Sequence, residues 1–285
     1  MPVDSALVKE LREKTGLPMM ECKKALEKTG GDIEKAFEEL RRAGLKAQEK
    51  LSGRAAKEGR IGSFVSPDGK MGVLVALRCE TEPVGKNEAF QKLLGDLVQV
   101  IAARNPKNIE ELNGLALPSG STVGAAVTDL VNKIRENISI GRFARFEADA
   151  ISQYVHFDQK KAAMVALKGG LAQDPKVAEL GKDLGMHIVF SKPSCLTRDR
   201  LDKQIVDKER DILIDAAKND PKNAQKPLDI LKKIVEGQVV KFVASKCLAE
   251  QPFVKDEKVS VTQHLKNTGT GVSIEDFAYI ATDVA

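Results

Sequence analysis

The sequence contains few of the residues on which most catalytic and metal sites are built. Its 285 residues include no Trp, two Tyr, three His and four Cys, and aromatic residues make up 4% of the chain. The histidines, His156, His187 and His264, do not have the spacing of a metal site, and no Ser or Cys lies in a nucleophile elbow. A glycine-rich phosphate loop is also missing. We therefore expect neither covalent catalysis nor a cofactor, metal or nucleotide bound by the chain itself.

The cysteines and the hydrophobic residues indicate a cytoplasmic protein. Cys22, Cys79, Cys195 and Cys247 are far apart and include no Cys-x-x-Cys pair, so neither a disulfide framework nor a zinc site is expected. No run approaches the roughly 20 apolar residues that a bilayer span needs. The charged N-terminus lacks the apolar segment of a signal peptide. These absences predict a reduced, cytoplasmic environment without membrane attachment.

The balance of charge argues against a dedicated nucleic-acid binder. The 45 basic and 41 acidic residues leave a net charge of +4, whereas a basic stripe should dominate in such a protein. The few aromatic residues also offer little surface on which single strands could stack. A weak RNA contact through the basic segment 46–60 stays an alternative. It would weaken steeply with salt, because neutralising phosphates releases counterions.

Length and hydrophobic pattern predict an α+β protein with several domains. The chain is about twice the usual size of one domain. Strands paired by hairpins, with helices in separate blocks, favour α+β over a doubly wound sheet. Two helices with narrow apolar stripes predict a protruding antiparallel hairpin, joined by Asn219 to Asn223. The predicted parts are a three-helix domain (1–45), a linker (46–60), one core subdomain (61–138), a second related subdomain (139–195 and 241–285) and the helical hairpin (196–240).

The N-terminal helices have clear start and stop signals. Thr15-Gly16 ends the first helix, and Pro18 suits the first turn of the second, which runs from Met19 to Lys28. Asp32 can cap the third helix. Such small three-helix units commonly dock onto other proteins.

The segment from Leu7 to Gly44 resembles the N-terminal domain of the bacterial elongation factor Ts family. The motifs that match at the family's spacing are Leu11-Arg12, Thr15-Gly16, Met19-Met20, Cys22-Lys23-Lys24-Ala25-Leu26 and Gly31-Asp32. The resemblance implies a ubiquitin-associated (UBA)-like domain and a nucleotide-exchange factor that binds the GTPase elongation factor Tu, both with GDP and without nucleotide. It also implies that four residues touch the GTPase domain of that partner: Arg12, Met19, Met20 and Lys23. From the residues alone, Met19 could equally belong to the small core, whereas Lys23 should be exposed.

The segment from Thr81 to Asn87, which we predict to be a loop after a strand, extends the resemblance. The family's pattern is Thr-Asp-Phe-Val followed by a small residue, Lys and Asn, and this chain has Glu82 and Pro83 at the second and third positions. The resemblance implies that Thr81, Glu82, Pro83 and Val84 form the loop that displaces Mg²⁺ from the partner's nucleotide site. Because Pro cannot fill an aromatic-sized slot, we expect a shallower, stiffer wedge and an exchange activity that is retained but reduced or altered.

Three shorter motifs extend the resemblance further. Lys133 to Ile138 resembles Lys/His-Ile-Gly-Glu-Asn-Ile, with Arg135 in place of the glycine, and we expect Arg135 to block a close backbone approach. Tyr154-x-His156 matches, with Phe157 in place of a glycine, and Gln251-Pro252-Phe253-Val254 matches fully. The resemblance implies partner contacts by Ile134, His156, Phe253 and Val254. From the residues alone, His156 could be inert and Phe253 could belong to the core.

Two questions stay open at this level. The helical hairpin could join two copies of the chain, contact the partner, or do neither. A docking adaptor with a UBA-like domain and no exchange activity is the alternative to an exchange factor. Release of nucleotide, rather than formation of a complex, separates these two functions.

Overall fold

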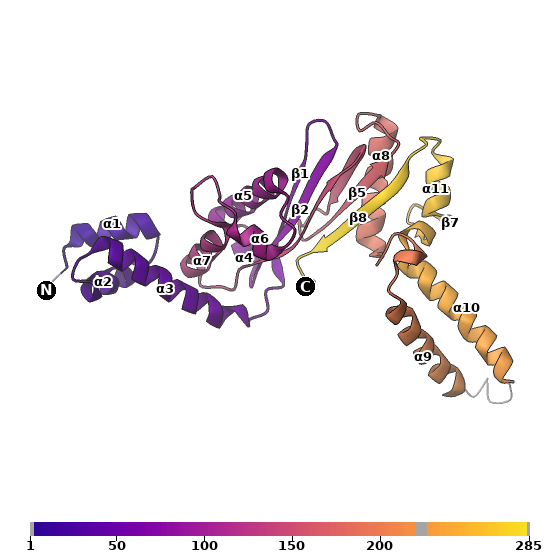
Figure 1. Cartoon of the computed structure of the whole chain (residues 1–285), viewed down its shortest axis with the longest axis horizontal. Coiled ribbons are helices and arrows are strands. Elements are labelled where there is room, and N and C mark those ends of the chain that lie inside the picture. The colour runs from indigo at the N-terminus through magenta and orange to yellow at the C-terminus, as the bar shows by residue number, and fades with distance from the viewer. Residues whose placement is uncertain (1–2, 220–226, 284–285) are drawn as a thin grey trace.

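The computed structural model describes residues 3–219 and 227–283, which form an elongated α+β molecule (Figure 1). Helices near the N-terminus form one end, two small sheets with helices form the middle, and a pair of long helices projects from the other side. In the described residues, none of the helices is both long and apolar enough to span a membrane.

The predicted signals mark the end of the first helix, the bounds of the second and the start of the third. The three helices are α1 (Ser5–Thr15), α2 (Met19–Lys28) and α3 (Ile33–Ser52). Gly16 ends α1 in the left-handed conformation, with φ of 65°, and the Asp32 side chain accepts a hydrogen bond from the Lys35 N–H at 3.0 Å. Pro18 lies one residue earlier than predicted, directly before the first turn of α2. A small core holds them together, built from Val8, Leu11, Leu17, Cys22, Ala25, Leu26 and Ala36.

The predicted linker over 46–60 is largely wrong. Helix α3 continues to Ser52 and strand β1 begins at Glu58, so only 53–57 connect them. The residues after Gly44 are mostly good helix formers, and their polarity reflects an exposed helix face rather than a lack of structure. The other face lies along α7 (Val123–Ile134), where the Thr128 hydroxyl donates to Gln48 Oε1 at 2.6 Å.

The first sheet has the antiparallel order β1-β2-β3. Its strands are β1 (Glu58–Val65), β2 (Met71–Cys79) and β3 (Ser139–Glu147). Helices α5 (Glu88–Arg104), α6 (Ile109–Gly114) and α7 pack on its outer face around Val73, Val75, Leu77 and Cys79, which alternate along β2.

The second sheet has the antiparallel order β4-β5-β8, with α8 (Pro175–Ser191) packed on it. Its strands are β4 (Ala150–Val155), β5 (Lys161–Lys168) and β8 (Ser273–Ala281). A two-stranded sheet of β6 (Pro252–Phe253) and β7 (Asp256–Ser260) and the helix α11 (Val261–Asn267) complete this part of the chain. The inner faces of the two larger sheets meet in one apolar cluster that includes Leu74, Ala76, Ile151, Met164 and Ile280.

The predicted boundary between the core subdomains at 138/139 is wrong. Strand β3 pairs with β2 in the first sheet, and the chain enters the second sheet only at Ala150. The apolar alternation runs on across both strands, and alternation does not specify which strand is the partner. The change of sheet occurs around Asp149, whose carboxylate accepts a hydrogen bond from the Gly169 N–H at 2.8 Å.

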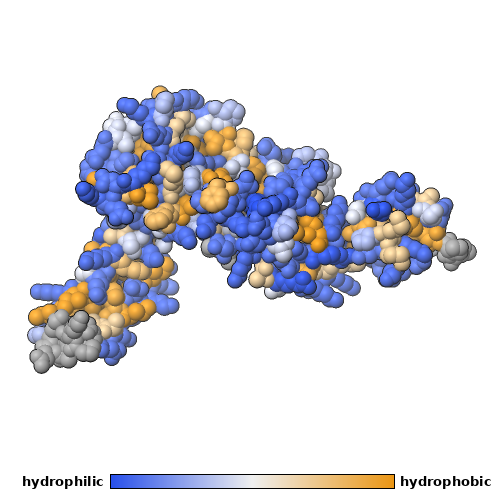
Figure 2. Space-filling model, turned by 180° about the vertical axis from the view of Figure 1, so that it is seen from behind, coloured by the Kyte–Doolittle hydropathy of each residue, from blue (hydrophilic) through white to orange (hydrophobic). Residues whose placement is uncertain are grey.

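The projecting part, which we call the arm, consists of α9 (Lys203–Asn219) and α10 (Leu228–Lys246), which pack against each other. Short 3₁₀ turns at Arg198–Arg200 and Leu248–Glu250 flank the arm. Its seam includes Ala217, Val235, Val239 and Val243. Of the predicted connection Asn219 to Asn223, all but Asn219 lies outside the described residues. Figure 2 shows apolar surface on the arm, where Ile205, Ile212, Ile230 and Val240 are exposed.

Gly44 allows α3 to approach α7 closely, and this contact generates a prediction about stability. A Cβ at Gly44 would lie 1.8 Å from Asn132 Nδ2, whereas a Cβ at Gly95, inside α5, would meet nothing within 4 Å. Gly44→Ala should therefore lower the free energy of unfolding by about 1–3 kcal/mol through overpacking. Gly95→Ala, the matched control, should raise it by about 0.5–1 kcal/mol. Urea unfolding of both variants tests this, and equal gains would contradict the close packing.

Candidate functional site

The segment Thr81–Asn87 forms a helical turn rather than the predicted loop. Helix α4 (Glu82–Gly85) occupies its middle, with Pro83 in the first turn, where the missing N–H costs nothing. Asn87 caps the start of α5, because its side chain accepts a hydrogen bond from the Ala89 N–H at 2.9 Å. Val84 packs on the first core, while Thr81, Glu82 and Pro83 are exposed. The turn therefore presents a carboxylate and a proline ring on a short, stiff support.

This turn is fastened to a second predicted motif, Lys133–Ile138. Glu136 accepts hydrogen bonds from both the Thr81 N–H at 3.0 Å and the Thr81 hydroxyl at 2.7 Å. In the opposite direction, the Asn137 N–H donates to the Glu80 carboxylate at 2.6 Å. Residues more than fifty positions apart thus form one unit, which we call the clamp. Sequence reasoning included Glu136 in a motif but assigned it no role.

Charged side chains surround the exposed turn. Lys86 lies 2.9 Å from Glu82, and its hydrogen bond and positive charge lower the pKa of the Glu82 carboxyl. The buried Arg60 contributes a second, more distant cation at 3.9 Å. Lys160 pairs with Glu58 at 2.6 Å, and this hydrogen bond raises the pKa of Lys160. Sequence reasoning missed Arg60, Glu58 and Lys160, because only the pairing of distant strands brings them here.

Arg135 has a different role from the one expected. It ends α7 in the left-handed conformation, with φ of 65°. Glycine adopts this conformation readily, so the glycine in the family's pattern is explained without the close approach of another backbone segment. Its guanidinium pairs with both carboxylate oxygens of Glu21 on α2. Ile134 is partly buried against the first core. This motif therefore connects the N-terminal helices to the clamp.

The predicted N-terminal contact residues lie at the surface. Arg12 and Lys23 are exposed, and Met19 and Met20 are 51% and 60% exposed. Met19 is therefore not a residue of the small core. Met20 directly precedes Glu21, and the pair of Glu21 with Arg135 joins the helix that carries these methionines to the residue next to Glu136 of the clamp.

The predicted residues of the second sheet divide into surface and core. His156, whose Nδ1 lies 3.2 Å from the Tyr154 hydroxyl, and Val254 line one surface hollow of about 510 Å³. Phe253 is 1% exposed and stacks on His264 with ring centroids 3.9 Å apart. The prediction that its side chain meets a partner is therefore wrong in this conformation. From the sequence alone, a single phenylalanine in this motif could lie either in the core or at the surface.

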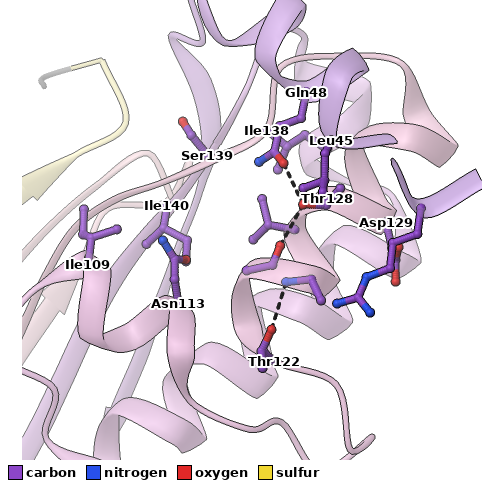
Figure 3. Close-up of a pocket in the computed structure, with 14 residues that line it drawn as sticks. Leu45, Gln48, Ile109, Asn113, Thr122, Thr128, Asp129, Ile138, Ser139 and Ile140 are labelled. Carbon is purple, nitrogen blue, oxygen red and sulfur yellow. Dashed lines mark hydrogen bonds between the residues drawn. The ribbon is translucent and has the colours of Figure 1, made fainter. Parts of the chain in front are cut away.

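Another hollow, of about 520 Å³, lies between α3, α6, α7 and β3 (Figure 3). Leu45 and Ile109 stand at its sides, and the bonded pair Gln48 and Thr128 lies between helices. None of the predicted site residues lines it. Apart from the buried Phe253, the predicted residues instead lie at the clamp, on α1 and α2, and in the hollow beside His156.

Comparison with known proteins identifies relatives over nearly the whole chain. The sequence model of the family described as Elongation factor TS matches residues 80–282. A protein named Elongation factor Ts from Azoarcus sp. (strain BH72) is 44% identical over 273 residues, which cover 95% of this chain and 88% of that protein. Proteins of the same name from Methylococcus capsulatus and Bordetella avium are 40% and 42% identical, again over 95% of this chain, and over 90% and 89% of their own lengths.

The fully matching motif Gln251–Val254 generates a prediction about pH. Buried His187 donates from Nε2 to Gln251 Oε1 at 2.9 Å and accepts at Nδ1 from the Val254 N–H at 3.2 Å, so its ring is neutral. Burial lowers the pKa of His187 below its ordinary value of 6.5. The unfolded chain therefore binds more protons, and the free energy of unfolding should fall as the pH drops below about 6.5.

Urea unfolding at pH 7.5 and at lower pH tests this contribution. His187→Gln should weaken the fall in stability with acid, whatever its effect at pH 7.5. His156→Gln, a change at a histidine outside this core, should leave the wild-type pH dependence in place. An unchanged dependence in His187→Gln would contradict the assignment.

Proposed function

Because the chain belongs to the elongation factor Ts family, we propose that it releases GDP from elongation factor Tu so that GTP can bind. Membership of the family gives the chain a role in translation elongation, with elongation factor Tu as its partner. The reaction proposed here forms and breaks no covalent bond and uses no cofactor. It takes place in the cytoplasm, on the GDP-bound partner, and passes through a nucleotide-free complex.

The observation that carries this proposal is the clamped turn at Thr81–Val84. An exchange factor must bind the nucleotide-free GTPase more tightly than the nucleotide-bound form, and by linkage nucleotide binding weakens by the same factor. A tenfold effect needs about 1.4 kcal/mol of contacts made only in the nucleotide-free state. The hydrogen bonds of Glu136 hold the turn in place, so contact energy can be used to displace the partner's Mg²⁺ and phosphate elements instead of ordering the turn.

In this proposal, the other surface residues form separate areas of contact with elongation factor Tu. The UBA-like helices present Arg12, Met19, Met20 and Lys23 to the GTPase domain, beside the clamp. His156 and Val254 form a second contact area, on the second sheet. Ile134 supports the first contact area from within the first core. The arm, as an antiparallel helical hairpin, contacts either a second copy of the chain or the partner. No nucleic acid takes part.

Release of a fluorescent GDP analogue from elongation factor Tu tests the proposal. With excess GDP as chase, substoichiometric amounts of the protein should accelerate release catalytically. Complex formation without faster release would favour the docking adaptor. Glu136→Ala should reduce acceleration by roughly thirtyfold, because the turn loses two hydrogen bonds worth about 1 kcal/mol each. Glu110→Ala, at an exposed glutamate of α6, is the matched control and should not change it.

Pro83 generates a separate prediction about efficiency. A proline ring reaches less far from the turn than an aromatic side chain, so Pro83→Phe should raise kcat/KM for exchange several-fold. The measurement is the same release assay over a range of partner concentrations. Pro67→Phe, at an exposed proline in the β1–β2 turn, controls for added apolar surface. No change with Pro83→Phe would show that this position does not limit exchange.

A further inference from the structure

The base of the arm contains two thiols in contact. Cys195 precedes α9 and Cys247 follows α10, and their sulfur atoms lie 3.5 Å apart in the buried seam. All four cysteines are free thiols. Cys79 donates to the Thr81 carbonyl at 3.1 Å, Cys22 lies against Thr15, and Cys195 also donates to the Lys246 carbonyl at 3.7 Å. The pair at the base of the arm is not among the residues to which the proposed exchange mechanism gives a role.

The backbone holds these two cysteines opposite each other. Cys195 and Cys247 form a parallel β-bridge, in which the Leu248 N–H donates to the Cys195 carbonyl at 2.9 Å. The Ser194 N–H donates to the Lys246 carbonyl, also at 2.9 Å. Bridge partners have Cα atoms about 5 Å apart, within the range that a disulfide spans. The sulfur atoms need to approach by only about 1.5 Å to reach bonding distance.

We propose that Cys195 and Cys247 form a reversible disulfide that closes the base of the arm. The oxidant is a low-molecular-weight disulfide such as oxidised glutathione. The Cys195 thiolate attacks one of its sulfur atoms and releases the first thiol. Cys247 then attacks the Cys195 sulfur of this mixed disulfide and releases the second thiol. Two protein thiols and one small disulfide thus give one protein disulfide and two small thiols, which carry the two protons.

The surroundings of the pair determine the order of the two steps. Cys195 is 7% exposed and Cys247 is completely buried, so the oxidant reaches Cys195 first. Burial first, and then the hydrogen bond with Cys195 and the charge of Glu250, raise the pKa of Cys247 to about 12, although the charge of Arg198 opposes them. Cys247 is therefore protonated at neutral pH, and the second step is slow. The disulfide forms under sustained oxidation rather than in every brief encounter with oxidant.

The proposed bond changes how the arm is attached. In the reduced protein, the bridge hydrogen bonds and the ion pair of Arg198 with Glu250 join the two segments at the base. In the oxidised protein, a covalent bond closes the loop that contains all of α9 and α10. A polypeptide cut inside α9 or α10 then stays in one piece.

The variant Cys22→Ala/Cys79→Ala, in which only the pair remains, provides a clean test. After incubation with oxidised glutathione, both remaining thiols should become unreactive to iodoacetamide, and a peptide cross-linked between Cys195 and Cys247 should be found by mass spectrometry. Trypsin cleavage within the arm should then give one band on a non-reducing gel and two on a reducing gel. Dithiothreitol should restore both thiols. The wild-type protein should lose two of its four thiols.

Other outcomes would overturn the proposal. These are a stable glutathione adduct on Cys195 without a cross-link, a disulfide in the wild-type protein that involves Cys22 or Cys79, or thiols that stay reactive at every ratio of oxidised to reduced glutathione. Cys195→Ala and Cys247→Ala should each abolish the cross-link. If either variant folds poorly, the double variant that retains the pair still decides the question.

Discussion

The face-to-face packing of the two three-stranded sheets is the contact on which the rest of the molecule depends. Strand β2 buries Val73 and Val75 against the helices of the first unit and Leu74 against the second sheet, and β5 is buried on both faces in the same way. Because β2 and β5 are buried on both faces, the two sheets pack directly against each other. This packing brings one end of the first sheet next to one end of the second. The Ile61 N–H donates to the Gln159 carbonyl at 2.8 Å, so the β4–β5 turn lies beside β1. The clamped turn and the charges of Glu58 and Lys160 are neighbours for this reason.

Much of the local structure could be predicted from the sequence, because local chemistry encodes it. Helix ends follow from Gly16, Asp32 and Asn87, whose backbone conformation or side chain satisfies the terminal groups. The outer face of β2 follows from its alternation. The motifs at Met19-Met20 and Thr81–Val84 could be proposed by resemblance, and all of their residues except Val84, which packs on the first core, are exposed.

The rest depends on contacts between distant residues, which local patterns do not encode. Nothing in the alternation assigns β3 to β2, and nothing in a polar segment shows that α3 extends along α7. The stack of Phe253 on His264 required α11, a short helix without a clear apolar period. The left-handed backbone at Arg135 and its pairing with Glu21 likewise became visible only in three dimensions.

The continuation of α3 to within a few residues of β1 has a consequence for binding strength. A flexible linker would let the N-terminal helices move through a large volume. Each additional linker residue would then lower the effective concentration of the second contact and so weaken binding. A helix held against α7 instead fixes the separation between the methionines of α2 and the clamped turn. The two contacts then act together, as the two donor groups of a bidentate ligand do. A partner that presents both sites at that separation gains the effective concentration of the second contact, and a protein that presents only one does not.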